Sequence, residues 1–181
     1  MPGSVLDGPV EDMRIDQFQM VGLVETLDIQ APAISARARI PQEHTIFEGH
    51  FPGHPLMPGV LLTEMMAQTC GFLLLALNGF SKMPFLAALK EVKLRDFVRP
   101  GTDLLCQAVR VHDGSGYAVM KASIRRLEEE NRVCDGSLTF RIVPYPNDQL
   151  RRHMLERGRE VGLAVPSTGV VVAEEGAEYE R

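Results

Sequence analysis

A histidine and a glutamate, His50 and Glu64, stand fourteen residues apart (64 − 50 = 14) and together could perform acid–base chemistry. His50 lies in the stretch GHFPGHP, where two prolines and two glycines prevent a helix and fix the direction of the imidazole. Glu64 stands in a long apolar stretch, and burial there disfavours its charged form. A base near neutrality and a carboxyl group that stays partly protonated form an acid–base pair.

Three neighbours of Glu64 add to this arrangement. Pro58 suits the first turn of a helix, so the amides of Gly59 and Val60 would point out of the helix start and favour developing negative charge. Gln68, one turn after Glu64, lies on the same face and could hydrogen-bond its carboxyl group. Base, acid and oxyanion donor together suit removal of a proton α to a carbonyl, with a β-hydroxyl leaving as water. The apolar helix face would accommodate an acyl chain.

Each of these residues also has a purely structural interpretation. His50 could cap a loop, and Glu64 could reach the surface from a partly exposed face. His50 and His54 are four residues apart, which on a helix would suggest metal ligation, but Pro52 and Pro55 rule that helix out. We therefore expect no metal site and no cofactor. The sequence also lacks a phosphate-binding glycine loop and an activated serine or cysteine nucleophile.

The elements that must position these side chains follow from the sequence pattern. Two short β-rich stretches precede the Pro/Gly-rich loop, a helix runs from Pro58 to near Asn78-Gly79, and four strand-like segments follow, separated by RPGT, DGSG and EEEN turns. The expected strands are 19–29, 33–40, 84–94, 103–112, 117–127 and 132–143. Consecutive strands imply an antiparallel sheet, and a helix that is apolar all round must be wrapped by it.

Composition limits the class of protein. A chain of 181 residues with 45% hydrophobic and 24% charged residues suits one globular domain, and a net charge of −5 argues against a nucleic-acid partner. Three widely spaced cysteines form neither a disulfide framework nor a zinc knuckle. The N-terminal stretch lacks the features of a secretory signal, so we expect a cytoplasmic protein. Residues 58–77 have the length of a membrane span, but Glu64 and Gln68 in the middle favour a buried helix.

The stretch GHFPGHPLMPGVLLTEMMAQ (49–68) closely resembles the signature of the (3R)-hydroxyacyl-acyl carrier protein dehydratases of type II fatty acid synthesis. That signature combines a GHFP turn, an MPGV helix start and a glutamate fourteen residues after the histidine. The likeness extends from about residue 17 to residue 143 and includes KEVKLRDFVRPGTDL. It implies an α+β hotdog fold, in which a long central helix is wrapped by a curved antiparallel sheet, paired as a homodimer or as a hexamer built from three dimers.

The resemblance also implies a reaction and the residues that perform it. His50 matches the catalytic histidine, Glu64 the catalytic acid, and Gly59 the residue whose amide binds the thioester oxygen. The implied activity is that of a lyase, which dehydrates (3R)-hydroxyacyl-acyl carrier protein to the trans-2-enoyl form in fatty acid or lipid biosynthesis. In the family dimer the histidine comes from one chain and the acid from the other. Related dehydratase/isomerases carry Asp in place of Glu64 and Cys in place of Val60, which favours dehydration alone here.

The chain departs from the family pattern at a few positions. The family often has Phe at Leu94, Pro at Phe97 and Asp at Thr102. These positions affect the substrate tunnel or a turn, so they concern chain length rather than the reaction. We expect a lead at 1–15, the hotdog domain at 16–146, and a short amphipathic helix with a mobile acidic tail at 147–181.

An acyl carrier protein is strongly acidic, and this chain itself has a net charge of −5. The chain therefore needs a local basic patch to bind such a partner. The candidates are Lys90, Lys93, Arg95 and Arg99, which could equally form an ordinary solvated strand face.

Three other functions share the fold. A hydratase acting on enoyl-coenzyme A thioesters usually has an Asp-x-Asn-Pro-x-His pattern, which is missing here. Hotdog thioesterases lack the combination of GHFP and MPGV that this chain has. In a non-catalytic acyl-binding subunit we would expect the histidine or the glutamate to be replaced, and both are intact.

Overall fold

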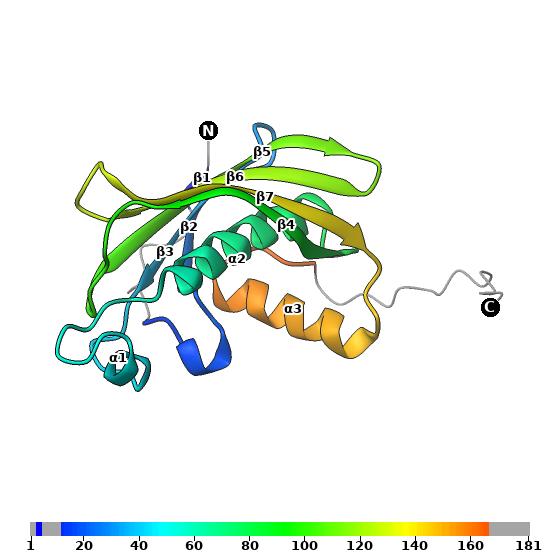
Figure 1. Ribbon diagram of the computed structural model, residues 1–181. Coiled ribbons are helices and arrows are strands. Elements are labelled where there is room, and N and C mark those ends of the chain that lie inside the picture. Colours follow the sequence, from blue (N-terminus) through cyan, green and yellow to red (C-terminus); the bar gives the residue numbers. More distant parts are fainter. Residues whose placement is uncertain (1–2, 5–11, 167–181) are drawn as a thin grey trace, which may run out of the picture.

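A long helix, α2 (Gly59–Leu77), lies in the concave face of a curved sheet in the computed structural model, which describes residues 3–4 and 12–166 (Figure 1). All neighbouring strands pair antiparallel, in the order β1-β2-β3-β5-β6-β7-β4. The strands are β1 (Gly3–Ser4), β2 (Leu23–Asp28), β3 (Ala33–Arg39), β4 (Met83–Leu94), β5 (Asp103–Gly114), β6 (Tyr117–Arg126) and β7 (Arg132–Val143). The predicted architecture, a helix wrapped by an antiparallel sheet, is confirmed.

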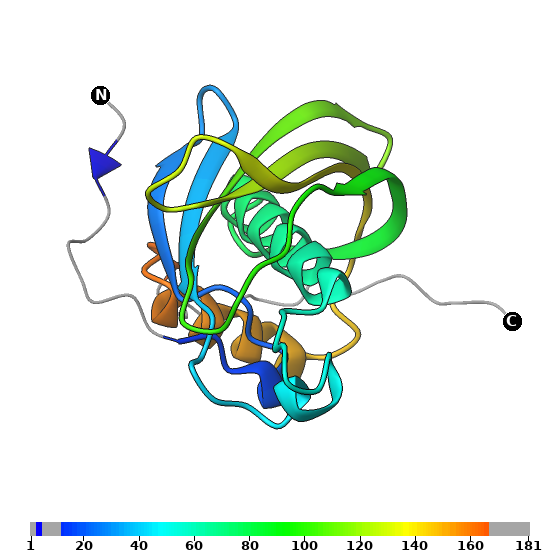
Figure 2. The same ribbon diagram turned by 60° about the vertical axis from the view of Figure 1, so that its left-hand side comes forward.

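Helix α2 forms where the pattern predicts it and is the centre of the core. Pro58 is its N-cap, and the helix ends at Asn78, followed by Gly79 in the left-handed conformation at φ 62°. The helix is long and apolar enough to cross a membrane, yet 61% of its most apolar window is buried inside the fold. It is therefore a core helix, as the sequence predicts, and Figure 2 shows the sheet curving around it.

The loop before α2 contains a helical turn that the sequence pattern did not predict. Helix α1 (Ile46–Gly49) ends at His50, its C-cap, because the prolines and glycines that follow cannot continue it. A second short element, the 3-10 helix η1 (Ile15–Gln17), precedes β2 and was also not predicted. The acidic tail at 172–181 lies outside the described residues.

Strand β4 forms one edge of the sheet, and its outer side pairs with no strand among the described residues. Its register with β7 shifts between Lys90 and Lys93, where Glu91 adopts a positive φ of 54°. Gly136 on β7 makes this bulge possible, since a Cβ there would lie 2.9 Å from a methyl group of Val92. The bulge thus bends the free edge of the sheet beside the start of α2.

Helix α3 (Asp148–Glu160) lies along the side of α2 that faces away from the sheet (Figure 1). Asn147 caps it by accepting a hydrogen bond from the amide of Leu150 at 2.8 Å. Leu155 and the following Leu163 are buried, and the amide of Val24 donates to the carbonyl of Val161 at 2.8 Å. The predicted C-terminal helix is therefore present, and it is packed into the core.

Candidate active site

His50 is held in one orientation by the turn in which it lies. Its backbone amide donates to the carbonyl of Ile46 at 3.1 Å, and the amide of Leu56 donates to the carbonyl of His50 at 3.2 Å. Its ring nitrogen Nδ1 lies 2.9 Å from the carbonyl oxygen of Leu56. A carbonyl oxygen can only accept, so Nδ1 carries the proton, and in the neutral ring Nε2 is left with a free lone pair. The turn therefore presents Nε2 as a base.

The first residue of α2 lies beside this histidine. Gly59 and His50 line the same cavity of about 300 Å³, together with Leu62, Leu94 and Phe97. The first amides of a helix have no acceptor within the helix and carry a partial positive charge, so the amide of Gly59 suits an anionic or polarised oxygen. A Cβ at Gly59 would clash with Cδ1 of Leu94, so a side chain here would displace Leu94. Val60, the next residue, is 73% exposed.

Glu64 is half-buried on α2 and is held by Gln68. Nε2 of Gln68 donates to Oε1 of Glu64 at 2.9 Å and to the carbonyl of Phe18 at 2.5 Å, while Oε1 of Gln68 accepts from the amide of Met20 at 2.9 Å. Because the backbone amide of Met20 can only donate, the side-chain atom of Gln68 that it contacts must be the oxygen, and the NH2 group therefore faces Glu64. The hydrogen bond that the i, i+4 spacing predicts is thus present, and Oε2 of Glu64 is left for another partner.

Within one chain, His50 and Glu64 line cavities on different sides of α2. Gly59, which shares the cavity of His50, and Glu64 are five residues apart, which rotates one about 140° from the other around the helix axis. Glu64 lines two other cavities, one of about 320 Å³ beside α3 and one of about 300 Å³ beside β4. Of the cavities described for residues 3–4 and 12–166, none is lined by both side chains. Within one chain His50 and Glu64 thus line separate cavities.

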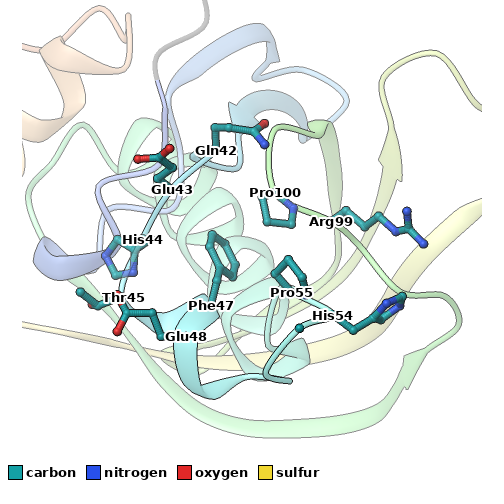
Figure 3. A pocket seen from close by; sticks show the side chains of 11 residues that line it. Gln42, Glu43, His44, Thr45, Phe47, Glu48, His54, Pro55, Arg99 and Pro100 are labelled. Carbon is teal, nitrogen blue, oxygen red and sulfur yellow. The ribbon is translucent and has the colours of Figure 1, made fainter.

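The largest of these cavities is a groove that contains neither His50 nor Glu64. It has a volume of about 940 Å³ and is lined by the loop before α1, by α1 itself, by the loop around His54 and by the turn around Pro100. Figure 3 shows His54 and Arg99 at one side of it and Glu43 and His44 at the other. Neither His50 nor Glu64 lines this groove, so its size alone does not mark it as the site of the predicted chemistry.

The predicted basic residues are only partly brought together. Lys90 and Lys93 are exposed on β4, where they register with Ser137 and Asp135 of β7. Arg95 forms an ion pair and hydrogen bonds with Asp135, so its charge is balanced; this contact lowers the pKa of Asp135. Arg99 lies apart from them in the groove of Figure 3. Lys93, which is exposed, is thus the candidate cation nearest in sequence to the Arg95–Asp135 ion pair.

The cysteines take no part in this site. Cys70, Cys106 and Cys134 are free and buried. Burial raises the pKa of Cys106 to about 12 and that of Cys134 to about 11, so both thiols stay protonated at neutral pH. In the described part of the chain, no group of three metal-ligating side chains comes together.

Three residues around Glu64 were not predicted from the sequence. Phe18 and Met20 hold Gln68 through their backbone, and Met154 of α3 lines a cavity of Glu64. Backbone groups carry no residue-type signal, and Met154 lies 90 residues after Glu64 (154 − 64 = 90). No local pattern could have indicated these contacts.

A curved antiparallel sheet around one long helix defines the class of this protein as the hotdog fold. A hypothetical thioesterase of Streptococcus pneumoniae, solved with coenzyme A, superposes with a TM-score of 0.52 over 68% of this chain and 90% of that one, at 13% identity. At that identity the likeness shows the fold alone.

The sequence profile of the FabA-like domain matches residues 14–137. A 3-hydroxyacyl-acyl-carrier-protein dehydratase, FabZ of Fusobacterium nucleatum, is 35% identical over 126 residues, which are 70% of this chain and 87% of the relative. FabZ of Caldicellulosiruptor saccharolyticus is 41% identical over 97 residues, 53% of this chain and 68% of the relative. The chain therefore belongs to the FabA-like family.

Proposed function

We propose that this protein is a lyase that removes water from a (3R)-3-hydroxyacyl chain carried on acyl carrier protein, giving the trans-2-enoyl thioester. The observation that carries the proposal is that His50 and Glu64 are each held by a hydrogen bond that leaves one reactive atom free. The 3-hydroxyacyl-acyl-carrier-protein dehydratases to which the chain is similar support the substrate class.

In the proposed reaction His50 acts as the base. Its Nε2 removes a proton from C2 of the acyl chain, and the electron pair of that C–H bond moves toward the thioester carbonyl. The amide of Gly59 donates to the carbonyl oxygen as negative charge develops there. Gly59 lines the same cavity as His50, which suits it to bind the carbonyl oxygen. Since the charge appears only during the reaction, this hydrogen bond favours the transition state over the bound substrate.

Glu64 acts as the acid in the second half of the step. Its protonated carboxyl group gives its proton to the C3 hydroxyl, and the C3–O bond breaks as water leaves and the C2–C3 double bond forms. Gln68 donates to Oε1, so Oε2 is the oxygen that delivers the proton in the proposed step. Proton exchange with solvent then returns His50 and Glu64 to their starting states. Glu64 and Val60 together favour dehydration without isomerisation of the double bond.

The complete site forms between two subunits. Exposed apolar side chains gather at the free edge of β4 and the start of α2, where an unpaired strand needs a cover. They are Val60, Phe85, Leu89, Leu94 and Phe97. A second copy that adds its own β4 antiparallel to this edge would cover them and bring its His50 loop to the side of α2 that carries Glu64. We propose this homodimer, alone or as three dimers in a hexamer.

The partner in solution is acyl carrier protein, which docks through basic residues beside the His50 cavity. Arg95 lines that cavity, and Lys93 is exposed nearby on β4. The burial of α2 in the fold supports a cytoplasmic protein without a membrane span. A net charge of −5 supports a protein without a nucleic-acid partner.

Mass spectrometry of the carrier protein tests this function. The purified protein is incubated with 3-hydroxyacyl-acyl carrier proteins of several chain lengths, and loss of water from the acyl chain is measured. His50→Ala and Glu64→Gln should each lower the rate by about 100- to 10,000-fold, the usual worth of a general acid or base. His54→Ala, a loop histidine outside the cavity of His50, is the matched control and should keep normal turnover. Near-normal turnover by either of the first two variants with a native circular dichroism spectrum would overturn the assignment.

A further inference from the structure

A cavity lies between α2 and α3 and has Glu64 in its wall. Its volume is about 320 Å³, at the lower end of the range for small-molecule sites. Ala67, Gly71, Phe72 and Leu75 line it along α2, so its apolar wall continues from Glu64 toward the end of that helix. The eleven residue steps from 64 to 75 span about 16 Å at the rise of an α-helix. The cavity thus follows an apolar face of α2, with a proposed catalytic residue at one end.

This space adjoins the cavity beside β4. Glu64 and Leu86 line both, so the side chain of Glu64 stands between the two. The β4 side carries the exposed apolar residues Val60 and Leu89 and is the side where the second subunit would bring its His50. A thioester that enters from the β4 side therefore places its reacting carbons at Glu64 and directs the rest of its chain toward α3.

Helix α3 supplies the wall opposite α2. His153, Met154 and Arg157 line the cavity from this helix, and Met154 is half-buried there. The wall is firmly held: Arg157 is 7% exposed and pairs with Glu160, and Nε of Arg151 donates to the carbonyl of Phe80 at 3.3 Å. All of α3 lies beyond residues 14–137, which match the FabA-like domain. The wall is therefore an addition of this chain to the matched domain.

We propose that α3 closes the acyl cavity and that Met154 sets the longest acyl chain the protein accepts. The inference rests on the proposed function, because it takes the acyl chain of the substrate as the occupant. An apolar cavity with a packed wall and a volume of about 320 Å³ has room for a chain of limited length. The unbranched side chain of Met154 fills the space that a longer chain would need.

Two substitutions at Met154 test the proposal through kcat/KM across carrier-protein substrates of increasing chain length. Met154→Ala removes the side chain beyond Cβ, so it should raise kcat/KM for the first chain too long for the native protein by about 10-fold or more, since one methylene in an apolar pocket is worth roughly 10- to 200-fold. Met154→Phe should lower kcat/KM for the longest accepted chain and spare the shortest. Leu155→Ala is the matched control, because Leu155 is buried on α3 but does not line the cavity. It should lower thermal stability without moving the optimum.

A binding measurement separates this inference from the reaction itself. The chain has no tryptophan, so His153→Trp places a single fluorophore at the cavity and Arg152→Trp places one on the exposed face of α3. An acyl carrier protein that carries a saturated acyl chain without a hydroxyl group cannot be dehydrated. Its binding should shift the fluorescence emission of the His153→Trp variant and not that of the Arg152→Trp variant. An emission shift without turnover of any hydroxyacyl substrate would refute the proposed function and keep the cavity assignment. An unchanged chain-length profile in both Met154 variants, or equal emission changes in both tryptophan variants, would overturn the role of α3.

Discussion

Mixing two inactive variants should restore activity if each site takes His50 from one subunit and Glu64 from the other. In one chain His50 lines the cavity at Gly59, whereas Glu64 lies about 140° around α2 in other cavities. A dimer with a two-fold axis has two equivalent sites. A mixed dimer of His50→Ala and Glu64→Gln then has one site with both defects and one site with neither.

The size of the recovery follows from counting sites. Random pairing of equal amounts makes half of the dimers mixed, and half of the sites in a mixed dimer are intact, so roughly a quarter of the wild-type activity should return. If His50 and Glu64 of the same chain met, every site would keep a defect, and activity would stay about 100- to 10,000-fold below wild type. The two arrangements therefore differ by well over tenfold in the same assay.

The assay is the dehydration rate measured after the two purified variants are unfolded and refolded together. Different affinity tags on the two subunits, recovered in one complex, establish that exchange has taken place. The control mixture pairs His50→Ala with a chain that carries both substitutions, which leaves no intact site in either arrangement. Continued inactivity of the first mixture after demonstrated exchange would refute the reasoning from the two sides of α2.

Three further outcomes are expected. Gly59→Ala should lower kcat/KM with little loss of thermal stability, because alanine favours the helix while its Cβ displaces Leu94 into the cavity of His50; an unchanged kcat/KM would contradict this. Charge reversal at Lys93 and Arg95 should raise KM for carrier-protein substrates and weaken its salt dependence, and no change in either would remove both from the docking site. Because Arg95 lowers the pKa of Asp135, their contact stabilises the fold above the unfolded pKa of about 4 and is lost as pH falls through the lower folded value. Asp135→Asn should therefore lower the unfolding temperature slightly at neutral pH but not in strong acid, and an equal loss at both would count against the ion pair.

Much of the fold could be predicted because its signals are local. The prolines and glycines after His50 exclude a helix there, so α1 ends at His50, and Pro58 and Asn78-Gly79 mark both ends of α2. The apolar composition of α2 requires a wrapping sheet, since a helix without a polar face has to be buried. The pairing of Gln68 with Glu64 was also predictable, because helix geometry places residues four apart side by side.

The amino-acid sequence by itself determined which chemistry the protein could offer, since the side chains of His50 and Glu64 and the signature around them are properties of neighbouring residues. The tertiary structure decided how that chemistry is enclosed. It placed Met154 in the wall of the Glu64 cavity, gave Gln68 the backbone of Phe18 and Met20 as further partners, and paired Arg95 with Asp135. These contacts join residues far apart in the chain, and whether they meet depends on how the sheet curves and where α3 packs. No local periodicity or turn signal carries that information.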